Sequence, residues 1–172
     1  MRRLLIGLLV VLVFTGVSFA QPPGLLVKKG AVIITVPGIE TGGTGIERGK
    51  TTGSEPRRSR SVRLAVEIAD TPEARRRGLM HRASLPESAG MLFIYPASGP
   101  RAFWMKNALI PLSVAFISSG WRITEIIRMN PPAGNADPPT YRSRKPARYA
   151  LEANQGWLKR NGVGAGARVR VE

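Results

Sequence analysis

The sequence contains no cysteine and a single histidine, His81. Without cysteine, the fold cannot contain a disulfide, a thiolate metal site or a cysteine nucleophile. One histidine with few clustered carboxylates is too small a ligand set for a usual zinc site, so no metal is expected. The glycine-rich segment 162–166 follows an expected helix and lacks the spacing of a phosphate-binding loop. We therefore expect no cofactor.

Acidic residues are also scarce. Asp and Glu number 11 against 26 Lys and Arg, which gives a formal net charge of +15 at pH 7. In a cytoplasmic protein, so strong a positive charge would indicate nucleic-acid binding. The same charge is compatible with anionic polymers as partners, or with a basic surface that is merely solvated. The choice depends on where the protein works.

The N-terminus has the three parts of a secretory signal peptide. Arg2 and Arg3 precede an aliphatic run over 4–14, and small residues precede a cleavage site between Ala20 and Gln21. The apolar stretch is slightly shorter than the roughly 20 residues of a membrane span, which favours cleavage over retention as an anchor. An exported chain without disulfides suits a bacterial periplasm. We predict a periplasmic monomer with no membrane span after cleavage and no nucleic-acid partner.

The remaining chain divides into a linker over 21–61 and a single domain over 62–172. The linker is rich in Gly, Thr and Arg and has few apolar residues, so it is expected to be poorly ordered. The exception is an apolar, β-branched stretch over 25–36, which predicts a hairpin or an edge strand. The folded core is therefore expected to begin near residue 62.

Within the domain, alternating apolar residues and turn signals predict short strands and two short helices. Asp70 or Thr71 is the expected N-cap of a helix over 72–77, and the second helix is expected over 154–160. Hairpins dominate and no β-α-β crossover repeats, so the fold class is α+β with a mainly antiparallel sheet. A barrel-like closure of that sheet is an open alternative. The expected strands cover 62–69, 91–95, 102–105, 112–117, 121–129, 149–152 and 168–171.

Four segments of the domain together resemble one family. They are Arg-Gly-Leu-Met-His-Arg at 77–82, Gly-Met-Leu-Phe at 90–93, Phe-Trp-Met-Lys-Asn-Ala-Leu-Ile-Pro-Leu at 103–112, and Leu-Glu-Ala-Asn-Gln-Gly-Trp at 151–157. Their order and spacing are similar to those of the domain-of-unknown-function 192 (DUF192) family, over residues 62–172. The resemblance implies a small β-rich α+β fold, often found behind a bacterial signal peptide. It implies no established activity.

Two positions depart from the usual pattern of that family. Ala108 stands where the family usually has Thr, and Ser113 stands where it usually has Asp. Acidic residues that are common in the turn at 118–120 are also missing here. If those carboxylates perform acid–base or metal chemistry in relatives, this chain cannot perform it in the same way.

The segment around Trp104 is the best candidate for a binding site. On a strand, Phe103 and Met105 face one side, which leaves Trp104 and Lys106 on the other, with Asn107 next to them. An indole beside a cation and an amide suits a sugar ring or an anionic group. The alternative interpretation places Trp104 in the core and makes Asn107 a turn residue.

Glu152 is the second candidate, because it lies in an apolar strand where an unpaired charge is costly. Its carboxylate either lines a binding cleft or forms a structural ion pair, with Lys106 or an arginine as the partner. No catalytic residue is assigned. The leading hypothesis is a binding or structural module whose cleft lies around Trp104, Lys106, Asn107 and Glu152, with an anionic envelope polymer or glycan as ligand. One alternative is an enzyme acting on cell-envelope polymers with Glu152 as acid or base. Another is a protein that binds a partner through an addable strand at 32–36.

Overall fold

The computed structural model describes residues 28–37, 59–134 and 136–172. The predicted signal peptide, its cleavage site between Ala20 and Gln21, and most of the predicted linker lie outside these residues. The strands and helices, in chain order, are β1 (Lys28–Val36), β2 (Arg60–Ala69), α1 (Pro72–Arg77), β3 (Ala89–Gly99), β4 (Ala102–Trp104), β5 (Leu112–Ile117), β6 (Ile123–Met129), β7 (Thr140–Arg142), β8 (Ala147–Asn154), α2 (Trp157–Arg160) and β9 (Arg168–Val171).

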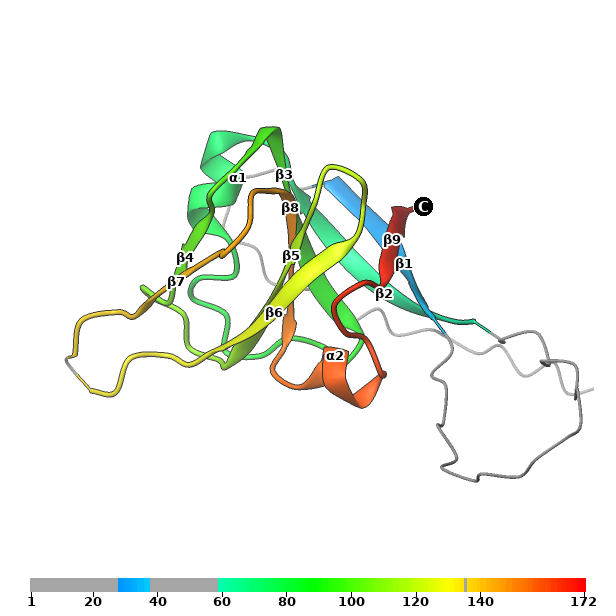
Figure 1. The fold of residues 1–172 in the computed structure, drawn as a ribbon. Helices are drawn as coiled ribbons and strands as arrows, with labels where there is room; N and C mark the ends of the chain where they lie inside the picture. Colours follow the sequence, from blue (N-terminus) through cyan, green and yellow to red (C-terminus); the bar gives the residue numbers. More distant parts are fainter. Residues whose placement is uncertain (1–27, 38–58, 135) are drawn as a thin grey trace, which may run out of the picture.

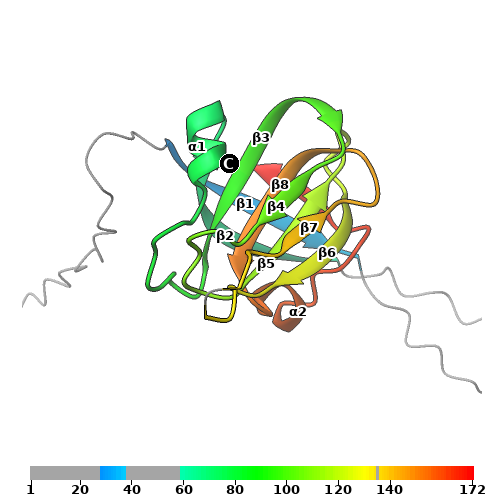
Figure 2. The same cartoon turned by 90° about the vertical axis from the view of Figure 1, so that its left-hand side faces the viewer.

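The domain is built on one sheet of seven strands in the order β6-β5-β8-β3-β2-β1-β9 (Figure 1). Every neighbouring pair is antiparallel except β2 and β3, which run parallel. β4 and β7 form a separate antiparallel pair. Figure 2 shows this pair in front of β5 and β8. The predicted β-rich fold with a mainly antiparallel sheet and two short helices is confirmed.

The sheet is open, with β6 and β9 as its two end strands. The chain just before β6 nevertheless meets the start of β9. Ile123 N donates to Ala167 O (3.0 Å) and Val169 N donates to Trp121 O (2.9 Å). These bonds join the two ends of the sheet over a few residues only. The barrel-like alternative is therefore not confirmed.

The stretch predicted as a hairpin or an edge strand is a single inner strand over its described part. β1 pairs with β2 along its whole length and with β9 over 32–35. Val32 and Ile34 have no exposed surface. The hairpin prediction for 25–36 is wrong, because Lys28–Gly30 continue the ladder with β2 where a turn was expected. Since 32–35 is bonded on both sides, it offers no free edge to a partner, and the core begins well before residue 62.

Apolar side chains cover both faces of the central strands and form two clusters. On one face, residues of β1, β2, β8 and β9 pack with α2 around Leu64, Leu151 and Trp157. On the other face, residues of β3 and β5 pack beneath α1 and β4 around Phe93, Phe103 and Phe116. The rings of Phe93 and Phe103 meet edge to face with centroids 4.9 Å apart. The second cluster is the one that surrounds the candidate site.

Helix α1 begins and ends at the positions that its caps dictate. Thr71 is the N-cap, since its Oγ1 accepts a hydrogen bond from Ala74 N at 3.1 Å, and Pro72 occupies the first turn. Gly78 ends the helix with φ of +49°, a conformation that side chains other than glycine disfavour. Of the two N-caps considered, the structure selects Thr71 over Asp70. Neither described helix has the length and apolarity that crossing a bilayer requires.

Candidate functional site

A small pocket of about 40 Å³ lies between the C-terminal end of α1 and β4 with the residues after it. Three of the four predicted site residues converge there: Trp104, Lys106 and Glu152. The fourth, Asn107, is not among the lining residues. The lining consists of Arg75, Arg76, Arg77, Gly78, Leu79, Met80, Phe93, Phe103, Trp104, Met105, Lys106, Ala108, Leu112 and Glu152.

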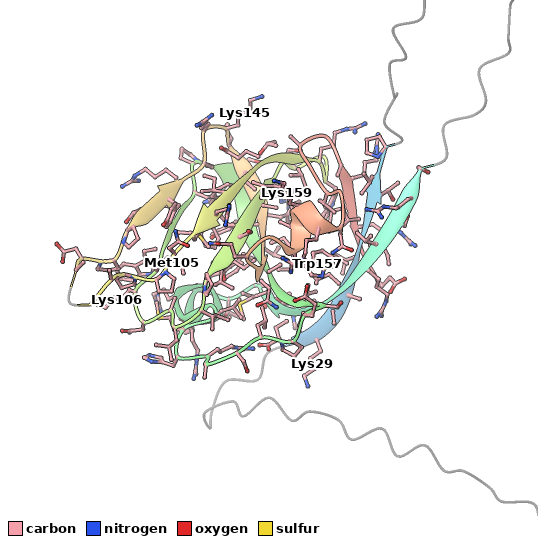
Figure 3. All side chains as sticks on the ribbon, turned by 90° about the horizontal axis from the view of Figure 1, so that it is seen from below. Lys29, Met105, Lys106, Lys145, Trp157 and Lys159 are labelled. Atoms are coloured by element: carbon pink, nitrogen blue, oxygen red, sulfur yellow. The ribbon has the colours of Figure 1, made fainter. Side chains whose placement is uncertain are left out.

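Trp104 and Lys106 form the outer wall of this pocket. Phe103 and Met105 are buried, whereas Trp104 on β4 is 51% exposed, so the predicted alternation holds and the core alternative for Trp104 is wrong. The Lys106 Nζ lies 5.2 Å from the centroid of the Trp104 ring, within the range of a cation–π contact. Figure 3 shows Lys106 next to Met105 at the edge of the domain, on the side away from Trp157. An indole and an ammonium group therefore meet solvent together.

Asn107 has a structural position instead. Its φ is +54°, in the left-handed region that Asn tolerates better than most residues. Its carbonyl oxygen accepts a hydrogen bond from the backbone N of His81 at 2.8 Å. His81 is itself left-handed, with φ of +61°. The two loops are thereby joined. Asn107 takes the turn position of the alternative interpretation, and it is not among the residues that line the pocket.

Glu152 lies at the base of the pocket on β8. Only 5% of the residue is exposed, and strand alternation places it on the face covered by α1 and β4. Burial raises the pKa of its carboxyl to about 8, and the positive charge of Arg82 opposes that rise only in part. At neutral pH the group is therefore mainly a neutral acid. A neutral carboxylic acid donates a hydrogen bond, which a carboxylate cannot do.

A buried ion pair lies on the same face of the sheet. Arg82 donates to both carboxylate oxygens of Glu67, at 2.6 and 2.7 Å. The register aligns Glu67 with Met91 of β3, and Met91 with Glu152 of β8, so the two acids are two strands apart in one row. Arg82, whose positive charge lowers the pKa of Glu152, is thus hydrogen-bonded to Glu67. The sequence alone did not predict that the Arg82–Glu67 pair lies beside Glu152, because the alignment of Glu67 with Glu152 depends on the parallel register of β2 and β3.

Three consecutive arginines of α1 line the pocket opposite Trp104. Arg75 is held in place, because its Nη1 donates to Asp70 O (2.7 Å) and Ile94 O (2.8 Å). Arg76 forms an exposed ion pair with Glu73 at 3.1 Å. Glu152 is the only carboxylate among the lining residues. The walls are therefore strongly cationic, and the one acid at the base is mainly uncharged at neutral pH.

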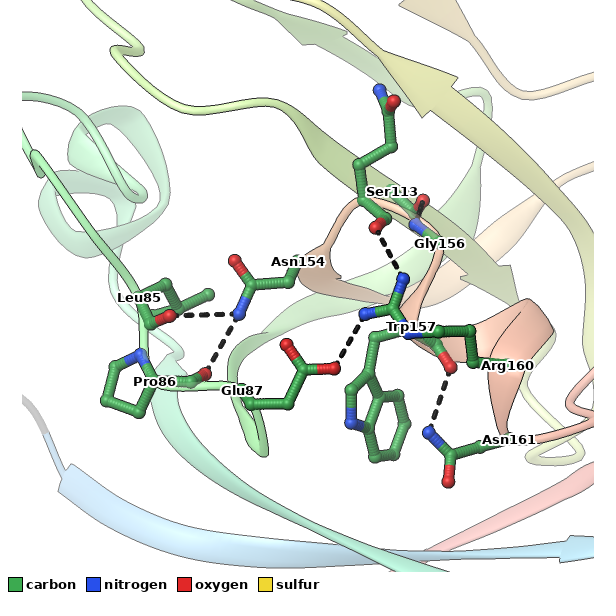
Figure 4. Close-up of polar contacts among 10 residues, drawn as sticks. Leu85, Pro86, Glu87, Ser113, Asn154, Gly156, Trp157, Arg160 and Asn161 are labelled. Carbon is green, nitrogen blue, oxygen red and sulfur yellow. Dashed lines mark hydrogen bonds and ion pairs between the residues drawn. The ribbon is translucent and has the colours of Figure 1, made fainter.

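The other polar residues of segment 151–157 hold the fold together. Asn154 Nδ2 donates to the carbonyl oxygens of Leu85 and Pro86, at 3.0 and 2.9 Å (Figure 4). Ser113 Oγ accepts a hydrogen bond from the Gly156 backbone N at 3.2 Å. The residue that replaces the usual family Asp at position 113 thus accepts a backbone hydrogen bond near the start of α2, outside the pocket.

The comparisons with known proteins agree with this architecture. The DUF192 profile, described as an uncharacterized ACR family, matches residues 55–171. The chain is therefore a small β-rich α+β domain with a cationic pocket, and it belongs to the DUF192 family. No protein of curated function matches it.

Two crystal structures share the fold. One is a protein from Sinorhizobium meliloti 1021, provisionally described as a transcription regulator. It is 32% identical, with a TM-score of 0.66, and the match covers 86% of this chain and 97% of that one. The other is a protein of unknown function from Novosphingobium aromaticivorans DSM 12444. It is 25% identical, with a TM-score of 0.59, and the match covers 80% and 83% of the two chains. Neither comparison assigns a ligand to the pocket.

Proposed function

We propose that this protein is an exported, non-catalytic module that binds an anionic carbohydrate of the bacterial envelope in the pocket between α1 and β4. The observation that carries the proposal is the exposed indole of Trp104 beside cationic side chains, above a buried acid. An indole face suits the apolar face of a sugar ring, and its edge tolerates water. The signal-like residues 1–20 support export, and export places envelope polymers within reach.

The charges of the pocket favour an acidic sugar over a neutral one. Lys106 and the arginines of α1 attract a carboxylate or a sulfate, and Glu152 in its neutral form does not repel it. Its acid proton can be donated to a ring hydroxyl or to the anionic group of the ligand. A site of this kind distinguishes acidic from neutral sugars by the charge at its rim, and it selects among them by hydrogen bonding at its base.

An enzyme that acts on envelope polymers is the second candidate, and Glu152 is the observation that favours it. A carboxyl whose pKa lies near 8 holds its proton at neutral pH and can act as a general acid. Glycoside hydrolysis usually requires a second carboxylate across the scissile bond, however, and the lining contains none. Glu152→Gln separates the two functions, because the amide still donates a hydrogen bond but cannot transfer a proton.

A titration with matched sugars tests the binding proposal. The purified protein is titrated calorimetrically with glucuronate and with glucose at pH 7. We expect saturable glucuronate binding and at least tenfold weaker binding of glucose, because the two sugars differ in the carboxylate that the cationic walls attract. Trp104→Ala should weaken glucuronate binding about tenfold, equivalent to ~1.4 kcal/mol, without loss of folding since the ring is half exposed.

The control for charge is Arg170→Ala on β9. Arg170 is exposed and lines no part of the pocket. The substitution removes one positive charge far from the site, and since salt screens distant charges, the affinity for glucuronate should change by no more than about twofold. Lys106→Ala, in contrast, should weaken binding and reduce its dependence on salt. Equal binding of glucuronate and glucose, or unchanged affinity in Trp104→Ala, would contradict the proposal.

A further inference from the structure

The cationic pocket is one end of a longer groove. A second, larger hollow of about 430 Å³ adjoins it and shares four of its lining residues: Arg75, Arg76, Phe103 and Trp104. The second hollow adds Pro72 at the start of α1, Tyr95 of β3 and Ala102 of β4. Both hollows thus lie between the same helix, α1, and the same strand, β4. Figure 1 shows these two elements and β7 on one side of the main sheet.

The two hollows follow one another along the segment that forms one wall of the groove. Ala102 lines only the second hollow and Lys106 only the first. Lys106 lies in the turn after β4, so its distance from Ala102 is below the roughly 13 Å that a fully extended segment would span. Trp104 lies between them in the chain and lines both hollows. Its exposed indole is therefore placed where two adjoining rings would both reach it.

The second hollow is also cationic, because Arg75 and Arg76 line it as well. The guanidinium carbon of Arg75 lies 5.1 Å from the centroid of the Tyr95 ring, which lines the second hollow but not the first. The guanidinium carbon of Arg101 lies 3.9 Å from the same centroid, but Arg101 is not among the lining residues. The two backbone carbonyls that accept hydrogen bonds from Arg75 fix it further. No carboxylate lines the second hollow, and Glu73, the acid paired with Arg76, belongs to a solvent-exposed ion pair. Such a pair is weak, so an anionic ligand can compete for the arginine.

We propose that the site binds an acidic polysaccharide as an extended chain, with one sugar unit in the Glu152 pocket and the next unit in the hollow between Tyr95 and Ala102. This inference rests on the proposed function and adds the polymeric nature of the ligand. One anionic group per unit would then meet positive charge in each hollow, from Lys106 in the first and from Arg75 and Arg76 in the second. The indole of Trp104 lies between the two units.

Oligomannuronates of one to four units test the inference. We expect the affinity to rise at least tenfold from one unit to two and to change little beyond that, because only one additional unit finds a subsite. If the protein had a single subsite, a two-unit ligand would offer it two equivalent units, and the affinity would rise only about twofold. Binding is measured by calorimetry on the purified protein at one fixed ionic strength.

Ala102→Trp separates the two hollows. The side chain of Ala102 is exposed and lines only the second hollow, so an indole there should fill that hollow and leave the first one open. In Ala102→Trp we expect the affinity for the one-unit ligand to be unchanged, and we expect no increase in affinity from one unit to two. Ala165→Trp is the matched control, since Ala165 is exposed in the chain before β9 and lines neither hollow.

The outcomes distinguish the two proposals. If the native protein binds one unit and two units equally tightly, the extended-chain inference is wrong and the binding function stands. The extended-chain inference is also wrong if Ala165→Trp abolishes the increase in affinity from one unit to two as Ala102→Trp does, because the increase would then not depend on the second hollow. If neither mannuronate nor glucuronate binds at any length, the proposed function itself fails. Thermal melts of both variants show whether each is folded.

Discussion

Replacing Arg82 by Met is expected to lower the free energy of unfolding by about 3 to 5 kcal/mol, the cost of removing one partner of a buried ion pair. The Glu67 side chain is 8% exposed and that of Arg82 is 18% exposed, so neither charge is well solvated. Without the guanidinium, the Glu67 carboxylate loses two short hydrogen bonds, and Glu152 loses the positive charge that opposes its desolvation. Urea denaturation at pH 7 measures the change.

Two further variants show whether burial is the cause. Arg63→Met breaks the ion pair between Arg63 and Glu172, whose side chains are 63% and 39% exposed, respectively. Because this pair is exposed, the free energy of unfolding should fall by less than about 1 kcal/mol. The double variant Glu67→Gln with Arg82→Met should recover part of the lost stability, because no unpaired charge then remains at position 67. If Arg82→Met is no more destabilising than Arg63→Met, the burial of the Arg82–Glu67 pair does not make it more important for stability than an exposed pair.

The stability of the protein relative to Glu152→Gln is expected to fall as the pH rises from about 5 to about 8. The folded pKa of Glu152 is about 8, whereas its ordinary value is 4.5. Between these values the unfolded chain has released the proton and the folded chain still holds it, so raising the pH favours unfolding. The slope is at most about 1.4 kcal/mol per pH unit, and the total is a few kcal/mol.

Urea denaturation of both proteins at several pH values measures the slope. The glutamine variant cannot ionise at this position and keeps a hydrogen-bond donor, so the difference between the two proteins isolates the carboxyl group. Glu87→Gln is the control, because it makes the same chemical change on an exposed side chain that pairs with Arg160. Equal slopes for the two substitutions would show that the burial of Glu152 is not the cause.

The parts of the fold that the sequence predicted best depend on neighbours in the chain. The boundaries of α1 agree because Thr71, Pro72 and Gly78 act within one turn of the helix. The final strand over 168–171 agrees because its alternation is local. β7 is missing from the strands expected from the sequence, since three residues among prolines carry almost no pattern of their own. Its existence depends on pairing with β4, some forty residues earlier in the chain.

The site shows the same division between local and distant causes. Trp104 could be assigned to the outer wall because strand alternation fixes its side, and Lys106 reaches the same wall from the turn that follows β4. Glu152 could be singled out because a charge in an apolar strand is unusual. The arginines of α1 join the site through the packing of that helix beside β4, and Arg82, which is hydrogen-bonded to Glu67, joins it through the effect of its charge on Glu152. No spacing in the sequence brings those residues together.

The strand order also determines when the chain can fold. β8 lies between β5 and β3, yet it consists of residues 147–154, close to the end of the chain. Until those residues have been synthesised, the β5–β6 hairpin and the β1–β2–β3 group share no backbone ladder. Pairings between distant segments also form slowly. The seven-stranded sheet therefore cannot be completed until nearly the whole chain has been synthesised, because the strand that joins its two parts is among the last to be made.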